Sequence, residues 1–262
     1  MSIIRVGAII LRFLMHFRHS LDRLIDVFYW PILDLLLLGL TSLYFAEIAG
    51  ENGSQITLIL VAGVIFWLIV YRSQYELSGN LLEEMWNKNL LNLFVSPLTF
   101  WEWLTALLLI GLIKSALSFS FAALLAFLLY KIQILAYGPQ IIPFAALLLL
   151  TGWWLGFIIA GLLMRYGTRI QAFAWTAVWA IAPFSGLYYP ISVLPDWAQK
   201  IAAALPTSYI FEGIRETIMT GTMDPAKFWT ALILNLVYLT VAIVFLRLSF
   251  GAILKKGLAQ LH

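Results

Sequence analysis

The chain has 262 residues, of which 63% are hydrophobic and only 11% are charged, and its formal net charge is +3. Because cysteine is absent, disulfides, thiolate nucleophiles and cysteine-ligated metal sites are excluded. No basic cluster or nucleic-acid-binding motif accompanies the positive charge, so we expect no nucleic-acid partner. The composition is typical of a polytopic membrane protein.

Six apolar stretches are each long enough to cross a bilayer. A hydrocarbon core of about 30 Å needs roughly 20 apolar residues in a helix, and these stretches lack the alternation of barrel strands. The sequence therefore predicts an all-α polytopic membrane protein with six transmembrane helices. We expect the spans at residues 29–49, 56–77, 103–130, 141–164, 172–190 and 228–250.

Residues 1–27, before the first span, combine a basic stripe with apolar faces on one helix. The stripe is Arg5, Arg12, His16, His19 and Arg23, and the apolar residues are Ile9, Ile10, Phe13, Leu14 and Phe17. This pattern predicts an interfacial amphipathic helix, with its basic stripe on anionic headgroups and its apolar side in the acyl boundary. A simple positively charged leader is the alternative. No carboxylate lies in register with the two histidines, so we expect no metal site.

A segment of mixed chemistry, residues 79–103, separates the second and third spans. Asn80 followed by Glu83 resembles a capping box and Pro97 provides a stop, so we expect a short helix over residues 80–93. Its apolar face is Leu82, Met85 and Trp86 with Asn89 and Leu93, and its charged rim is Glu83, Glu84, Asn87 and Lys88. A loop that only reverses the chain direction needs a few polar residues. A capped amphipathic helix is more than such a loop needs, so we favour a docking element. A helix that rests on headgroups is the alternative.

Two charged residues inside predicted spans, Asp34 and Lys114, stand out because burial of a charge in lipid is costly. Asp34 falls in the first span and Lys114 near the middle of the third. They could pair with each other, stabilise neighbouring structure, or contact a substrate.

The fourth span carries small residues at every fourth position, Gly152, Gly156 and Ala160, beside Trp153 and Trp154. Such a row lets helix backbones approach closely in lipid. We therefore expect a helix–helix seam here, with the tryptophans packed in it or anchored at the membrane interface.

The fifth span carries Trp175 and Trp179 one turn apart, and Tyr188 and Tyr189 follow at its outer end. Aromatic faces can line a path for glycans or lipids. Aromatic side chains also form belts at membrane interfaces, and the pattern is compatible with either role.

Four prolines, at positions 183, 190, 195 and 206, interrupt the apolar sequence before the last span. It is too broken for one spanning helix and too hydrophobic for a solvated loop. We expect a re-entrant extracellular hairpin over residues 190–218, with helix starts after Pro195 and Pro206. The charged residues expected to hold this hairpin together are Glu212, Arg215 and Glu216.

The basic residues set the expected orientation. In a six-span topology one side carries only Lys131, Lys200, Arg215 and Lys227, while most other Lys and Arg residues fall on the opposite side. The positive-inside rule therefore predicts that both termini are cytoplasmic.

The order of these parts resembles the permease subunit of ABC-2 type exporters. Two passages strengthen the resemblance: NLLNLFVSPLTFWEWL (89–104) is similar to the family's helix and Ser-Pro approach to the third span, and YPISVLPDWAQKIAAALPTSYIFEGIRE (189–216) is similar to its C-terminal hairpin. The resemblance extends over essentially the whole chain, which implies a single ABC-2 type transmembrane domain at residues 1–262.

The resemblance implies a homodimer bound to two ATP-binding-cassette ATPase subunits in the plasma (inner) membrane of a prokaryote, surrounded by membrane lipids. It implies export of an amphiphilic or bulky substrate such as a lipid-linked polysaccharide, a lipid or a drug. Residues 80–93 would be the coupling helix. The chain has no GxxxxGK[ST] loop, so we expect no enzymatic activity and no cofactor in this chain, with ATP and Mg²⁺ bound by the partner subunit.

We expect the protomers to meet along the first and fifth spans, with the path between them. The candidate path residues are Asp34, Lys114, Trp175, Trp179, Tyr188 and Tyr189. The alternative function is an ion-coupled transporter or channel without an ATPase. Such proteins usually carry several intramembrane carboxylates, and the predicted spans offer Asp34 as the one good candidate.

Overall fold

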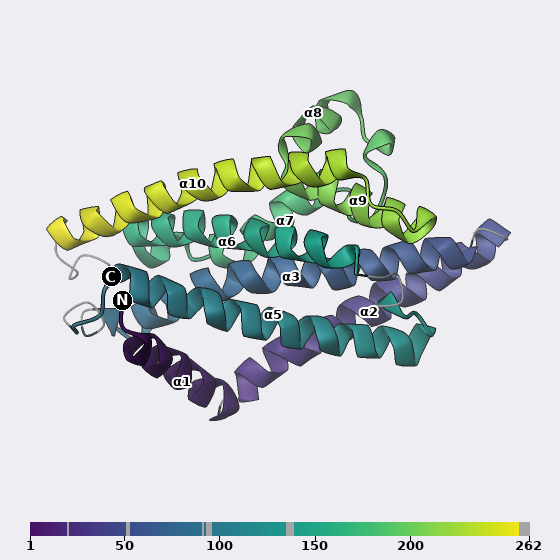
Figure 1. Cartoon of the computed structure of the whole chain (residues 1–262). Coiled ribbons are helices and arrows are strands. Elements are labelled where there is room, and N and C mark those ends of the chain that lie inside the picture. Colours follow the sequence, from purple (N-terminus) through teal and green to yellow (C-terminus); the bar gives the residue numbers. More distant parts are fainter. Residues whose placement is uncertain (20, 51–52, 91, 93–95, 135–138, 257–262) are drawn as a thin grey trace.

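The computed structural model describes every residue except 20, 51–52, 91, 93–95, 135–138 and 257–262, and the described chain is helical without strands (Figure 1). Five of its helices are long and apolar enough to cross a membrane. They are α2 (Leu21–Ala49), α3 (Gly53–Trp86), α5 (Phe100–Tyr130), α6 (Ile141–Tyr166) and α10 (Pro225–Lys256). The shorter α-helices are α1 (Ile3–His19), α7 (Phe173–Ile181), α8 (Asp196–Ala204) and α9 (Pro206–Thr220). The chain is therefore an all-α protein with the architecture of a polytopic membrane protein.

Helices α3 and α6 pack together at the centre of the bundle along the expected small-residue seam. A Cβ atom on Gly152 would lie 2.7 Å from the Val70 carbonyl oxygen, and one on Gly156 would lie 2.7 Å from a Leu77 methyl carbon. Both distances are shorter than van der Waals contact, so only glycine permits this backbone approach. The seam predicted from the fourth span is confirmed.

Helices α6 and α10 run parallel, which constrains the path of the chain between them. Near the middle Thr151 donates a hydrogen bond to Asn235 at 2.9 Å, and near the far end Arg165 donates to Ser249 at 2.7 Å, with the same separation of 84 residues in both pairs. Trp154 also donates to Asn235, at 3.0 Å, so this tryptophan packs in the interior. Since two successive parallel helices need a return path, residues 167–224 carry the chain back along the bundle (Figure 1).

The return is made in pieces. The expected fifth span over residues 172–190 contains only the nine-residue α7 and the 3-10 helix η4 (Ala182–Phe184). Nine residues rise about 14 Å, half of a hydrocarbon core. Pro183 lacks an amide donor, and Gly186 has φ +70, which ends the helical path. The prediction of one continuous spanning helix over residues 172–190 is therefore wrong.

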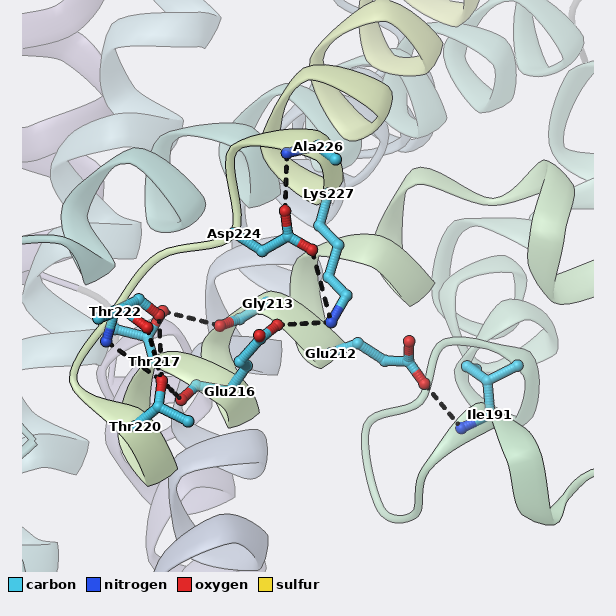
Figure 2. A network of polar contacts seen from close by, with 10 residues as sticks. All are labelled: Ile191, Glu212, Gly213, Glu216, Thr217, Thr220, Thr222, Asp224, Ala226 and Lys227. Atoms are coloured by element: carbon cyan, nitrogen blue, oxygen red, sulfur yellow. Dashed lines mark hydrogen bonds and ion pairs between the residues drawn. The ribbon is translucent and has the colours of Figure 1, made fainter.

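The hairpin has the predicted helix starts: Pro195 caps α8, and Pro206 opens α9. Two of its charged residues, Glu212 and Glu216, reach different segments (Figure 2). Glu212 accepts a hydrogen bond from the Ile191 amide at 3.1 Å, and Glu216 pairs with Lys227 at 2.5 Å. Arg215 donates to the Gly186 carbonyl at 2.6 Å. Glu212 therefore makes its contact within residues 190–218, whereas Arg215 and Glu216 tie α9 to Gly186 before this segment and to Lys227 after it.

Helix α1 packs differently from a purely interfacial helix. Val6, Ile9 and Phe13 are buried in the protein core, where the sequence favoured the acyl boundary. Two residues of the basic stripe meet carboxylates: Arg5 lies 3.5 Å from Glu102, and Arg12 pairs with Glu84. The side chains of His16, His19 and Arg23 lie outside the described part. The opposite edge of α1 is apolar and exposed, and it consists of Ile4, Leu11 and Met15.

The expected helix start at Asn80 is wrong, because α3 continues through it to Trp86. The Asn80 amide donates to the Glu76 carbonyl at 2.5 Å and to the Glu76 carboxylate at 3.0 Å, so it bonds backwards within the helix. Its capping-box pattern was therefore misleading. A true capping box joins Thr99 and Glu102 at the start of α5. Residues 91 and 93 of the predicted 80–93 helix lie outside the described residues.

Candidate functional site

A groove of about 400 Å³ lies between α2, α3 and α7. Its lining consists almost entirely of aromatic side chains around one carboxylate. The lining residues are Trp30 and Asp34 from α2, Trp67, Leu68, Tyr71 and Tyr75 from α3, and Trp175, Thr176 and Trp179 from α7.

The groove forms because three helices each present a stripe with four-residue spacing. Residues at i and i+4 share a helix face, which holds for Trp30 with Asp34, for Trp175 with Trp179, and for positions 67, 71 and 75 of α3. Helices α2 and α7 both pack on α3, so the three stripes converge. The α3 stripe was missed in the sequence, although its regular spacing is the signal that could have identified it.

The aromatic rings form a continuous wall. The ring centroid of Trp179 lies 6.4 Å from that of Trp67 and 6.3 Å from that of Tyr71. Tyr71 stacks on Tyr75 at 5.9 Å with an interplanar angle of 7°. These separations fall within the range of attractive aromatic pairs. Trp67 is only 3% exposed and forms the floor, whereas Trp30 and Trp179 are 48% and 44% exposed and form the rim.

Within the described part of the chain, Asp34 is the single charged residue that lines the groove. The nearby Arg72 follows Tyr71 on α3, and its guanidinium lies 5.5 Å from the Tyr71 ring centroid, but it is fully buried and does not line the groove. The groove surface is therefore apolar and acidic.

Lys114 lies elsewhere, in a buried ion pair. Its ammonium is 2.7 Å from the Glu76 carboxylate, with side chains only 6% and 3% exposed. Asn80 donates to the same carboxylate, and the Phe17 ring centroid lies 5.3 Å from the Lys114 nitrogen. The possible pairing of Lys114 with Asp34 is wrong. Glu76 occupies that role and was missed, although as a carboxylate inside the predicted span 56–77 it carried the same signal as Asp34.

The two tyrosines expected at the outer end of the path do not line the groove. The Tyr189 hydroxyl donates to the Pro183 carbonyl at 2.8 Å and closes the turn after α7.

The residues predicted to dock a partner divide into a buried set and an exposed set. Leu82, Glu84 and Met85 are buried, and Glu84 binds Asn89 at 2.6 Å besides its pairing with Arg12. Glu84 therefore does not belong to a charged rim.

Glu83 is half-buried, while Trp86, Asn87 and Lys88 are exposed. The Trp86 indole donates to the Gln171 side chain at 3.1 Å, and its ring stacks on Trp175 at 6.1 Å. Trp86 thus connects the end of α3 to a residue of the groove wall.

Neither a family model nor a curated protein matches this chain. Among the residues that the structure describes, no group of three or more His, Asp or Glu side chains could hold a metal ion. Aromatic faces around one carboxylate, in a groove of this size, are suited to holding a small molecule, because shape and a few polar groups determine such binding.

Proposed function

We propose that this chain is the permease subunit of an ABC-2 type exporter, which dimerises, binds two separate ATPase subunits and moves an amphiphilic or bulky substrate across a prokaryotic plasma membrane. The observation that carries the proposal is the aromatic groove between the first long helix and the broken returning segment. Asp34, Trp175 and Trp179, expected on the path from sequence, all line it. The order of elements supports the same family.

The path of the chain supports six membrane crossings. Five are single long helices, and the sixth is the composite return between α6 and α10. Its irregular backbone around Gly186 and Pro195 must be covered by protein or water at membrane depth. A second protomer against α2 and α7 supplies that cover, and the re-entrant hairpin and homodimer belong to this proposal. The basic-residue bias supports cytoplasmic termini, and the start of α1 and the end of α10 lie at one end of the bundle (Figure 1).

In place of a separate helix over residues 80–93, the proposed cytoplasmic docking element is the exposed end of α3 together with the described residues that follow it. Through Trp86, this element contacts both Gln171 and Trp175. A displacement of the α3 end by an ATPase subunit would therefore press on α7 and change the groove.

The test is reconstitution with the ATPase encoded by the neighbouring reading frame. We expect a stable complex of two permeases and two ATPases whose hydrolysis rate exceeds that of the ATPase alone. A complex that carries an inactivated Walker lysine in the ATPase is the matched control. Absence of any association in detergent and in proteoliposomes would contradict the proposal.

An ion-coupled transporter remains the second candidate because of one observation, the buried Glu76–Lys114 pair inside α3 and α5. Intramembrane ion pairs can relay protons in such proteins. Substrate uptake driven by a proton gradient in proteoliposomes that contain this chain alone would favour it over the exporter.

A further inference from the structure

Asp34 differs from the other carboxylates buried in the long helices. Glu76 is paired with Lys114, Glu84 with Arg12, and Glu102 with Arg5. Asp34 is half-buried, and no ion pair joins it to any residue of the described chain. Because an unpaired buried charge is costly, the groove has a place for a cation that the protein itself does not supply.

The walls around Asp34 add to this preference. Aromatic faces carry negative electrostatic potential and attract cations, most strongly where water is excluded. Among the described residues, the groove is lined by six Trp and Tyr side chains and by no Lys, Arg or His. An anionic ligand such as the pyrophosphate of a lipid-linked glycan would meet only repulsion from Asp34 here.

We propose that the groove binds a lipophilic organic cation, an amine or quaternary onium ion, with Asp34 as its counter-ion and the aromatic wall as its apolar contact. The volume of about 400 Å³ suits one small drug-sized molecule. As a substrate class this inference rests on the proposed exporter function. The binding step itself requires no ATPase.

The test uses two probes of nearly equal shape and opposite charge, tetraphenylphosphonium and tetraphenylborate. Each is titrated separately onto the purified full chain in one detergent, and saturable quenching of tryptophan fluorescence is measured. We expect saturable binding of the phosphonium and none of the borate. Asp34→Asn keeps the side-chain size but removes the charge. It should weaken phosphonium binding about tenfold, which corresponds to roughly 1.4 kcal/mol.

Glu47→Gln is the matched control, since Glu47 is an exposed carboxylate on the same helix and lies outside the groove. It should leave both titrations unchanged. Equal phosphonium affinity in wild type and Asp34→Asn would overturn the proposal. If Asp34→Asn is not monodisperse, the wild-type comparison decides: saturable borate binding as tight as phosphonium binding also overturns it.

The outcomes also separate this inference from the exporter proposal. If the cation binds as expected but the chain neither associates with the ATPase nor supports ATP-driven export, the exporter proposal fails and the cation site stands. If export proceeds while Asp34→Asn leaves phosphonium binding unchanged, the cation site fails and the exporter proposal stands.

Discussion

The buried pair of Lys114 and Glu76 provides a quantitative test of the fold. Replacing Lys114 with methionine leaves the Glu76 carboxylate, 3% exposed, without its cation at 2.7 Å. Removal of one partner from a buried pair costs about 3–5 kcal/mol. For a chain of this size, that corresponds to a decrease on the order of 10 °C in Tm.

The double variant Lys114→Met with Glu76→Gln should recover most of this loss, because neither charge remains and the amide at position 76 can still accept from Asn80. Lys227→Met is the matched control. The Lys227 pair with Glu216 is similarly short, at 2.5 Å, but its side chains are 29% and 36% exposed. Screening by solvent keeps the expected effect below about 1 kcal/mol.

Apparent Tm values of the purified variants, measured by size-exclusion fluorescence in one detergent, give the comparison. A Lys114→Met protein as stable as wild type would refute the burial argument, as would a double variant no more stable than the single one. The same proteins distinguish structure from transport. If the pair is structural, the stabilised double variant should transport at the wild-type rate.

Three further predictions concern assembly and activity. Glu84→Lys should destabilise the fold by about 3–5 kcal/mol, because it places a second cation beside Arg12 in a buried site. By contrast, Lys88→Glu, at the exposed position just after α3, should leave the apparent Tm unchanged and weaken ATPase association in a pull-down assay. In this cysteine-free chain, Leu40→Cys on α2 should crosslink between protomers. Val241→Cys on α10 should not, although the two side chains are equally exposed at 58%. Efficient crosslinking at position 241 alone would reject the proposed interface. Finally, the purified chain should hydrolyse no ATP by itself in a phosphate-release assay, because it lacks a phosphate-binding loop.

Several local features followed directly from the sequence. Long apolar runs predicted the five long helices, a row of small residues predicted the α3–α6 seam, and Pro195 and Pro206 predicted two helix starts. These features depend on backbone chemistry and on side chains within one or two turns, which a linear pattern contains.

Some features were not predicted from sequence patterns. All of them depend on which helix faces pack against each other. Helical spacing identifies the apolar face of α1, but protein and lipid are equally apolar neighbours, so only the tertiary structure shows that Ile9 and Phe13 face the core. In the same way, Asn80 could begin a helix or bond backwards within one, and the continuation of α3 decided between them.

The candidate site shows the same division. Sequence spacing placed Asp34 on one helix face and Trp175 with Trp179 on another, but it could not show that α2 and α7 flank α3 and bring these faces together around Trp67. It also left the partner of Lys114 open. The structure shows that Glu76 pairs with Lys114, while no cation of the described residues pairs with Asp34. Pairing between charges far apart in sequence depends on distances that only packing establishes, and it is packing that makes the groove acidic.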